Sequence, residues 1–372
     1  MNRLMILLAL ILLLTACITT DPLPTATMPP TDTPVPSTAT STLPILTNTI
    51  EPSPTPNYWW EQQETIAYIL PDLHGVHLVG LDPFTQHTFD SELIFLSPLA
   101  WSPDGTKIAL YTWKDVYLLD IYTSKYEPLT NLNDDKLHST TWSPDGTQLA
   151  FTSSKGIYIY DLGGNQVLHL DSTNYFDVTW SPDGSYLAIG TIKGDSDLLL
   201  YSFSMQSIFS IAKTIFDEEM PSWSPDGKRI AYIRRLNMYS SDLFIYDVET
   251  TETIRLTANG AYNEFPNWSP DGTMIAFEHN RFPLQPDIYV IDLDSGNLIQ
   301  ISNFAGTESW PVWSSDGKKI VFEFLSDPND EDEINAGKIP MEPSGIWVYD
   351  LQSESFVFIE GSEDSTWPAW RP

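Results

Sequence analysis

Hydrophobic residues in positions 58–372 form short runs that are separated by polar turn residues, and the pattern repeats every 38–45 residues. The first run of each repeat is Ile108–Leu110, Leu149–Phe151, Leu187–Ile189, Ile230–Tyr232, Ile275–Phe277 or Ile320–Phe322. The second is Val116–Asp120, Ile157–Asp161, Leu198–Ser202, Leu243–Asp247, Ile288–Asp292 or Ile346–Asp350. A weaker third run follows, as at Ile254–Thr257 and Leu298–Ser302. Nearly continuous apolar runs of this length predict strands that are buried on both faces.

The motif Trp-Ser-Pro-Asp-Gly precedes the first run of each repeat, with Ser315 replacing Pro in the sixth copy. Pro presets φ, Asp favours turns through its side chain and Gly supplies positive φ, so the motif predicts a hairpin turn. Because Asp recurs in every turn, we interpret it as structural. The repeated positions are Trp101, Asp104, Gly105, Trp142, Asp145, Gly146, Trp180, Asp183, Gly184, Trp223, Asp226, Gly227, Trp268, Asp271, Gly272, Trp313, Asp316 and Gly317.

Four short strands for each repeat of this length predict an all-β fold, a β-propeller of four-stranded antiparallel blades with the motif Trp ending the innermost strand. A degraded copy lies near the N-terminus, with Ile66–Tyr68 and Val76–Leu81 in the strand positions. At the other end, Trp367–Pro372 repeats the approach to a motif and places Trp370 where a motif Trp belongs. We therefore predict seven blades, with the C-terminal strand joining the N-terminal blade. An alternative assignment makes Trp59 the end of its own strand, which would leave Trp370 surplus. The alternative blade count is six.

The repeat, typified by Pro266–Phe277 followed by Asp287–Leu293, resembles the TolB-like propeller repeat. Similar repeats form the propellers of prolyl oligopeptidase-type enzymes. The resemblance covers residues 58 to 372 and implies the fold more specifically than the function. TolB-like proteins bind partner proteins at the bacterial envelope, so the resemblance implies a binding role. TolB itself has six blades and an additional α/β domain, and neither feature is expected here.

The N-terminus resembles a bacterial lipoprotein signal. Arg3 precedes an apolar stretch, Leu4–Leu14, that is too short to span a bilayer. Leu14–Cys17 then matches a lipobox, which predicts lipidation (for example with palmitate) of Cys17, the single Cys. The alternative is an ordinary secretory signal with an incidental Cys. The predicted organisation is a signal peptide at 1–17, a disordered linker at 18–57 and a propeller at 58–372. The protein is then exported and anchored on the outer side of a bacterial membrane, at the cell surface or in the periplasm.

Composition supports this organisation. Residues 20–57 include 10 Pro and 11 Thr and no Gly, Lys, Arg or aromatic residue, which predicts an extended linker that cannot form a core. The whole chain carries a formal charge of −32. That charge disfavours nucleic acids and anionic lipid surfaces as partners, and it suits cations and basic peptides.

No catalytic motif is present: the sequence has no Gly-x-Ser-x-Gly elbow, Walker loop, dinucleotide-binding fingerprint or His-Glu-x-x-His. Acidic residues instead recur shortly before the Trp positions, in what we predict to be the loops that enter the innermost strands. They are Asp177, Glu218, Glu219, Glu264, Glu308, Glu363 and Asp364. Four of these segments continue with Met220, Phe265, Trp310 or Trp367 and then Pro. A ring of carboxylates with an apolar collar would bind a cation or a Lys or Arg side chain; a solvated rim is the alternative.

The largest insertion, Leu325–Ser344, carries a second candidate site. Its alternating Asp327, Asn329, Glu331 and Glu333 faintly resemble a Ca²⁺ loop, although the central Gly of such loops is missing. From the sequence we expect a lipid-anchored binding scaffold, monomeric, whose partner is an envelope or extracellular protein with a basic segment. The alternative is a metal-dependent propeller hydrolase or lyase that uses carboxylates at the channel mouth.

Overall fold

The computed structural model describes residues 58–96, 98–132, 137–171, 175–191, 197–281, 285–327, 337–340 and 343–372. The chain divides into two units, Met1–Thr55 and Pro56–Pro372, and the described residues all belong to the second. Cys17 and residues 18–57 therefore lie outside the described part. No helix among the described residues is both long and apolar enough to cross a membrane.

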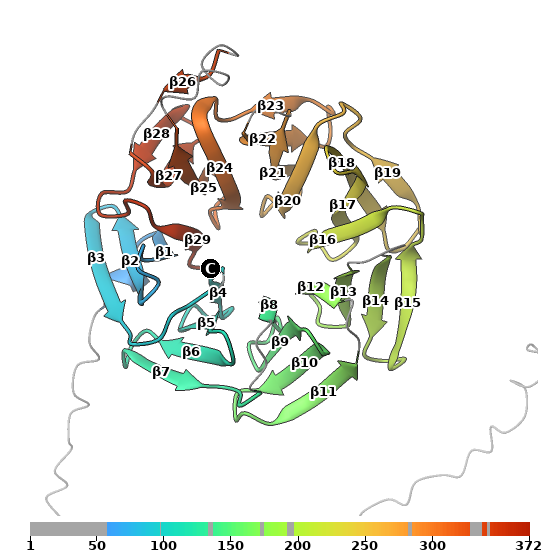
Figure 1. Cartoon of the computed structure of the whole chain (residues 1–372), viewed down its shortest axis with the longest axis horizontal. Helices are drawn as coiled ribbons and strands as arrows, with labels where there is room; N and C mark the ends of the chain where they lie inside the picture. Colours follow the sequence, from blue (N-terminus) through green and yellow to red (C-terminus); the bar gives the residue numbers. More distant parts are fainter. Residues whose placement is uncertain are drawn as a thin grey trace, which may run out of the picture. The chain divides into compact units, whose positions relative to one another are not determined.

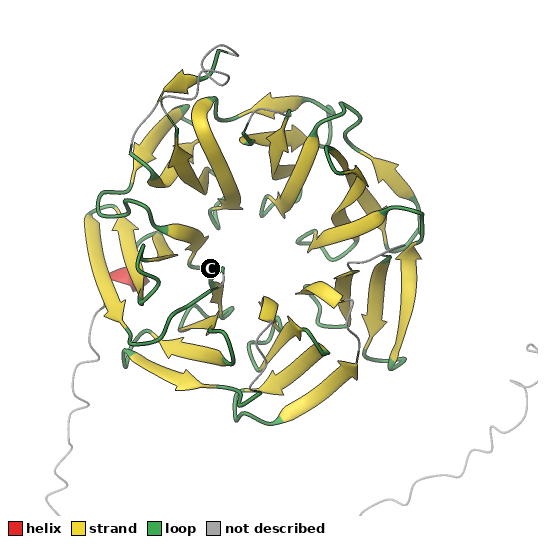
Figure 2. Cartoon of the chain, in the orientation of Figure 1, coloured by secondary structure: helices red, strands yellow, loops and turns green. Residues whose placement is uncertain are grey.

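The second unit is a ring of seven antiparallel four-stranded sheets around a central channel, which confirms the predicted fold (Figures 1 and 2). Each sheet is one blade, with strands a to d running from the channel outwards. Blade 1 holds β29, β1, β2 and β3, and blades 2 to 6 follow in chain order as β4–β7, β8–β11, β12–β15, β16–β19 and β20–β23. Blade 7 holds β24, β25, β27 and β28, with the short β26 added in parallel beside β24.

The strand bounds follow the sequence repeat. Strands a are β4 (Ala100–Trp101), β8 (Leu137–Trp142), β12 (Tyr175–Trp180), β16 (Asp217–Trp223), β20 (Tyr262–Trp268), β24 (Phe304–Trp313) and β29 (Thr366–Trp370). Strands b are β1 (Thr65–Ile69), β5 (Lys107–Tyr111), β9 (Gln148–Ser153), β13 (Tyr186–Thr191), β17 (Arg229–Asn237), β21 (Met274–Asn280) and β25 (Lys319–Ser326). All seven strands a end at a Trp, as the repeat predicts.

Of the two outer strands of each blade, strand c is mostly buried and strand d is more exposed. Strands c are β2 (Gly75–Leu81), β6 (Val116–Asp120), β10 (Gly156–Asp161), β14 (Leu198–Ser202), β18 (Ser240–Asp247), β22 (Asp287–Asp292) and β27 (Gly345–Asp350). Strands d are β3 (Phe84–Asp90), β7 (Lys125–Pro128), β11 (Gln166–Asp171), β15 (Ser207–Ala212), β19 (Thr253–Arg255), β23 (Leu298–Gln300) and β28 (Ser355–Phe358). β26 spans Ile339–Pro340, and the one helical element among the described residues is a 3-10 turn at Trp59–Glu61. Trp59 is thus not part of a strand a.

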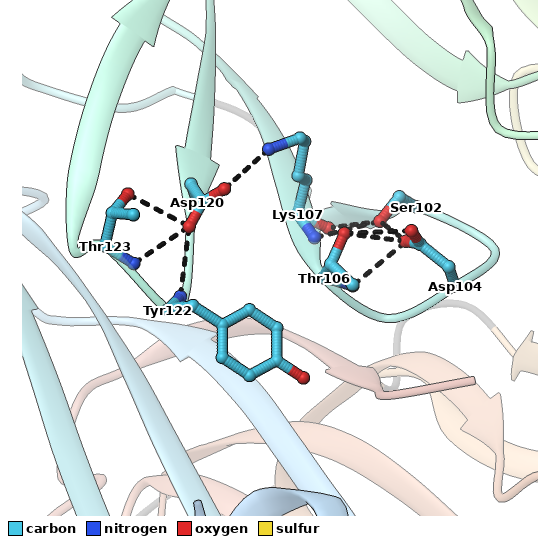
Figure 3. Close-up of polar contacts among 7 residues, drawn as sticks. All are labelled: Ser102, Asp104, Thr106, Lys107, Asp120, Tyr122 and Thr123. Atoms are coloured by element: carbon cyan, nitrogen blue, oxygen red, sulfur yellow. Dashed lines mark hydrogen bonds and ion pairs between the residues drawn. The ribbon is translucent and has the colours of Figure 1, made fainter. Parts of the chain in front are cut away.

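The repeated turn is held by its own side chains (Figure 3). In the first copy the Ser102 hydroxyl donates to Asp104 at 2.6 Å, and Asp104 accepts the backbone N–H of Thr106 at 3.1 Å. The other five copies repeat both bonds. Gly105 has a φ of 63°, a conformation that costs Gly little. Each motif Asp is therefore occupied in forming its turn.

The motif Trp side chains join neighbouring blades. The indole N–H of Trp142 donates to the carbonyl of Ala100, the residue just before the Trp of the preceding blade, at 2.9 Å. The same bond recurs at every junction except that of Trp180. Apolar side chains of adjacent blades pack together, as when Trp370 and Tyr68 of blade 1 meet Val321 and Ile346 of blade 7. The core of the protein thus lies between blades.

The C-terminal strand closes the ring. β29 pairs with β1 through Ile66–Trp370 and Ala67–Ala369, so the first blade is built from both ends of the propeller. Arg371 continues the closure, since its guanidinium donates to the carbonyls of Gly105 and Trp60 at 2.9 and 2.5 Å. Closure gives β1 a partner along its inner edge, so blade 1 has four strands like the other blades.

Candidate functional site at the channel mouth

Four consecutive blades carry the same irregularity in strand a. Met220, Phe265, Trp310 and Trp367 have φ values of 51–59°, and each is followed by Pro. At these positions two residues of strand a lie opposite one residue of strand b, which is a β-bulge. Pro suits the second bulge position because it has no N–H that would need a partner. A left-handed conformation costs a large residue about 1–3 kcal/mol, and such strain concentrates at ligand sites.

The bulges place their large side chains around the entrance of the central channel. A cavity of about 580 Å³ lies there, and strands a or their approach segments from all seven blades line it. Its lining includes the four left-handed residues, their prolines, Leu96, Leu99 and Phe176. The rings of Phe265 and Trp310 lie 3.9 Å apart between centroids. We call Met220, Phe265, Trp310 and Trp367 the collar.

Carboxyl groups hold the collar from behind. The Met220 N–H donates to Asp177 at 3.1 Å, the Trp310 N–H to Glu278 at 2.9 Å and the Trp367 N–H to Glu323 at 3.2 Å. The Phe265 N–H instead approaches the sulfur of Met220 at 3.4 Å. Each carboxyl group comes from the neighbouring blade, so the collar geometry is fixed between blades.

Two of the three capping side chains come from the same position on strand b. Glu278 and Glu323 each lie six residues after the motif Gly, and Ile233 and Gly190 occupy this position in blades 5 and 4. A Cβ at Gly190 would lie 3.3 Å from the Met220 nitrogen, so a side chain at this position would point at the Met220 N–H. Asp177, which lies opposite Gly190 on strand a, provides the carboxyl group instead.

Burial raises the pKa of all three capping carboxyl groups. Desolvation raises the pKa of Asp177 to about 7, despite the Met220 N–H, and the charge of Glu219 adds to the rise. Desolvation likewise raises the pKa of Glu278 to about 8, with further contributions from Glu264 and Glu323. The pKa of Glu323 is also raised by burial. Asp177 is enclosed by protein but keeps some accessible surface, and it lines the cavity.

Glu278→Gln is expected to leave stability at pH 5 nearly unchanged and to increase it at pH 9. Gln still accepts the Trp310 N–H but cannot ionise. In the wild type the folded pKa of Glu278 lies above the unfolded value, so stability falls as pH rises from about 4.5 to about 8. Each unit of raised pKa is worth about 1.4 kcal/mol, which predicts a gain of a few kcal/mol at pH 9. Urea unfolding at both pH values measures the gain.

The control for this experiment is Glu363→Gln, because Glu363 is exposed and caps no backbone group. Its stability should follow the wild type at both pH values. A Glu278→Gln protein whose stability also follows the wild type from pH 5 to pH 9 would show that the carboxyl group is not buried as described.

The predicted carboxylates occupy three different environments. Asp177, Glu218, Glu219, Glu264 and Glu308 lie within strands a, so their placement in loops was wrong; the strands begin earlier than the apolar pattern indicates. Glu363 and Asp364 do lie in the turn before β29, and both are exposed. The structure therefore does not gather all seven around one point.

Two of these carboxylates share an internal cation. Glu219 forms a two-point ion pair with Arg235, with both N–O distances at 2.9 Å, and Glu264 lies 3.5 Å from the same guanidinium group. Glu218 is fully buried and bonds Arg234 at 2.8 Å. Arg234 and Arg235 come from strand b of blade 5. Much of the negative charge that the sequence assigned to an external ligand is thus neutralised within the protein.

Glu308 faces away from this pair. It lies five residues before its Trp, as Glu218 does, whereas Glu219 and Glu264 lie four before theirs. Since neighbouring residues on a strand point to opposite faces, Glu308 projects from the other face of its strand. There it is fully buried, hydrogen-bonded with Asp287, and Asp287 lies 3.2 Å from Lys338. Desolvation, followed by the charge of Asp287, raises the pKa of Glu308 well above its ordinary value.

Comparison with known proteins agrees with this architecture. Residues 205–339 match the family model described as the TolB beta propeller domain, and residues 93–215 match that of eukaryotic translation initiation factor eIF2A. The described unit is thus a β-propeller whose residues 205–339 are similar to the TolB beta propeller domain. No curated protein matches the chain in sequence.

Solved structures share the propeller fold. A structure described as TolB from Agrobacterium tumefaciens is 24% identical, with 64% of this chain and 84% of that chain covered and a TM-score of 0.50. TolB from Acinetobacter baumannii is 20% identical, covering 83% and 67%, with a TM-score of 0.53. An oligogalacturonate lyase in complex with manganese is 14% identical, covering 79% and 84%, with a TM-score of 0.58. At these identities the likeness concerns the fold alone.

The candidate metal ligands of the insertion are largely outside the described residues. Asp327 is exposed at the end of β25, and Asn329, Glu331 and Glu333 lie in the part that the structure does not describe. Among residues that it does describe, no group of three His, Cys, Asp or Glu side chains is arranged to hold a metal ion.

Sequence reasoning named the four collar residues but missed the groups behind them. Glu278, Glu323, Arg235 and Lys338 each act on a residue of another strand or blade. A usable signal did exist for two of them: Glu278 and Glu323 follow the aromatic residue that ends the first apolar run of their repeats. Comparing that position across repeats would have shown it to be acidic in two blades.

Proposed function

We propose that this protein is an exported, lipid-anchored binding scaffold whose ligand site is the cavity at the channel mouth. The observation that carries the proposal is the collar, four large side chains held in left-handed conformations around one cavity. A concave, mainly apolar site with a few fixed polar groups is typical of ligand binding. Strain maintained in four successive blades, with carboxyl caps at three of them, indicates a site that is kept in one shape.

The chain path is consistent with this role. Hairpin turns a–b and c–d lie at one face of the ring, and the starts of strands a lie at the other, where the collar is. Tyr58, the first described residue, donates its hydroxyl to the Tyr122 carbonyl in the c–d turn of blade 2, at 3.2 Å. The described chain therefore enters the propeller at the face opposite the collar.

Trp310→Ala in the full-length protein is expected to abolish capture of the partner from envelope extract, because the collar loses its central aromatic surface. Met205→Ala is the matched control: Met205 is 69% exposed and lies in the c–d turn of blade 4, on the other face. The measurement compares the proteins that co-purify with the wild type and with each variant, in detergent-solubilised membranes. In the same experiment Cys17→Ser should move the protein from the membrane to the soluble fraction.

Capture that is unchanged in Trp310→Ala, or lost equally in Met205→Ala, would place the binding surface away from the mouth. Circular dichroism of both variants must match the wild type, so that lost capture reports the site and not the fold.

A further inference from the structure

The walls of the cavity are rich in aromatic faces. Phe265 and Trp310 form one pair, and Phe176 lies 4.6 Å from the His138 ring on the opposite side, between centroids. Trp367 contributes a third collar ring. Aromatic faces carry negative electrostatic potential, so they attract cations as well as apolar groups.

One carboxyl group reaches into this aromatic space. Asp177 is the only acidic side chain among the described residues that line the cavity, and no Lys or Arg is among them. Glu278 and Glu323 lie just behind, bonded to the backbone of Trp310 and Trp367. Arg235, a nearby cation, is already paired with Glu219 and Glu264. The cavity therefore presents an acidic group with no Lys or Arg side chain in its lining.

We propose that the cavity binds an organic cation, an alkylammonium group that lies against Asp177 and is covered by the faces of Phe265 and Trp310. The inference rests on the proposed function and names the chemical class of its ligand. A volume of about 580 Å³ accommodates a small molecule, or one ammonium-bearing side chain with its neighbours. Aromatic rings combined with an anion favour ammonium groups, which tolerate loss of water better when methylated.

Binding is coupled to ionisation of Asp177. The titratable groups around it are Tyr111 of β5, His138 of β8 and Glu219 of β16. Burial raises the pKa of Asp177 to about 7, so near neutral pH the empty site is partly protonated. A bound cation favours the carboxylate. Affinity should therefore rise with pH up to about 7, by at most about tenfold per unit, and then level off.

The test is calorimetric titration of the full-length protein with choline and with its uncharged carbon analogue, in which a tert-butyl group replaces trimethylammonium. Choline should bind at least about tenfold more tightly than the analogue at pH 8. Its affinity should fall between pH 8 and pH 5.5. Asp177→Asn, which retains an acceptor for the Met220 N–H, should lose this preference and the pH dependence. Glu363→Gln removes the same charge from an exposed turn and should retain both.

The outcomes separate this inference from the proposed function. Equal binding of choline and its analogue, or choline affinity independent of pH in the wild type, overturns the cation assignment and leaves the mouth as an apolar site. No binding of either probe also overturns it, while Trp310-dependent capture of a partner would still support the scaffold. The wild-type pH series needs no variant, so it decides the matter even if Asp177→Asn fails to fold.

Discussion

Deleting Trp367–Pro372 is expected to prevent the protein from folding to a stable monomer. The deletion removes nearly all of β29, the innermost strand of blade 1, and leaves β1 without its partner. Trp370 is buried, and truncating a buried Trp alone costs about 3–5 kcal/mol. Its indole also donates to the Val312 carbonyl, and the Ala369 carbonyl accepts the Trp101 indole at 3.4 Å. Since domains are stable by only about 5–15 kcal/mol, these losses together exceed what the ring tolerates.

Thermal unfolding and size-exclusion chromatography measure this effect. The deletion variant should aggregate or unfold far below the wild-type midpoint. Removal of Pro372 alone is the matched control, because Pro372 is exposed and lies beyond the strand. A deletion variant that melts like the wild type would mean that blade 1 is stable as β1–β3 alone and that the ring does not depend on its C-terminal closure.

The fold was predictable because the information that specifies it is local and repeated. Ser102, Asp104 and Gly105 form one turn within a few residues, and the same chemistry recurs in five further copies. The apolar runs predicted strands c closely, since Val116–Asp120 and Leu198–Ser202 are the bounds of β6 and β14, and they located strands b but predicted them too short, as with Ile230–Tyr232 within β17. The position of Trp370 predicted closure through β29, because a Trp ends every strand a.

The candidate site was less predictable because its contacts join distant positions. Strand a of blade 5 begins at Asp217, because Glu218 and Glu219 bond to Arg234 and Arg235 on strand b. In a hydrophobicity pattern such polar strand residues look like loop residues. The one-residue difference in offset between Glu308 and Glu264 sends their side chains to opposite faces of the strand. The bulges that shape the collar come from backbone conformation, which composition does not show.

The buried cluster of Lys338, Asp287 and Glu308 likewise joins positions that are distant in the sequence. Lys338 belongs to the insertion, 51 positions after Asp287 in the chain, yet the two side chains meet 3.2 Å apart with Glu308 beside them. The side chain of Lys338 is 3% exposed, and its ammonium group also donates to the Gln285 carbonyl at 2.8 Å. β26, directly after Lys338, pairs with the start of β24, the strand that carries Trp310 of the collar. The insertion is thus attached to the blade by a buried charge.

Lys338→Met is expected to destabilise the protein by about 3–5 kcal/mol, because it leaves Asp287 as a buried charge without its cation. Met has nearly the same length and volume, so lost packing contributes little. The control is Lys318→Met, which breaks an exposed pair with Asp316 and should cost less than about 1 kcal/mol. Urea unfolding of both variants measures the difference. The double variant Lys338→Met/Asp287→Asn removes the stranded charge as well, so it should recover part of the loss. If Lys338→Met and Lys318→Met unfold alike, Lys338 is not buried with Asp287, and the insertion does not hold β24 in place.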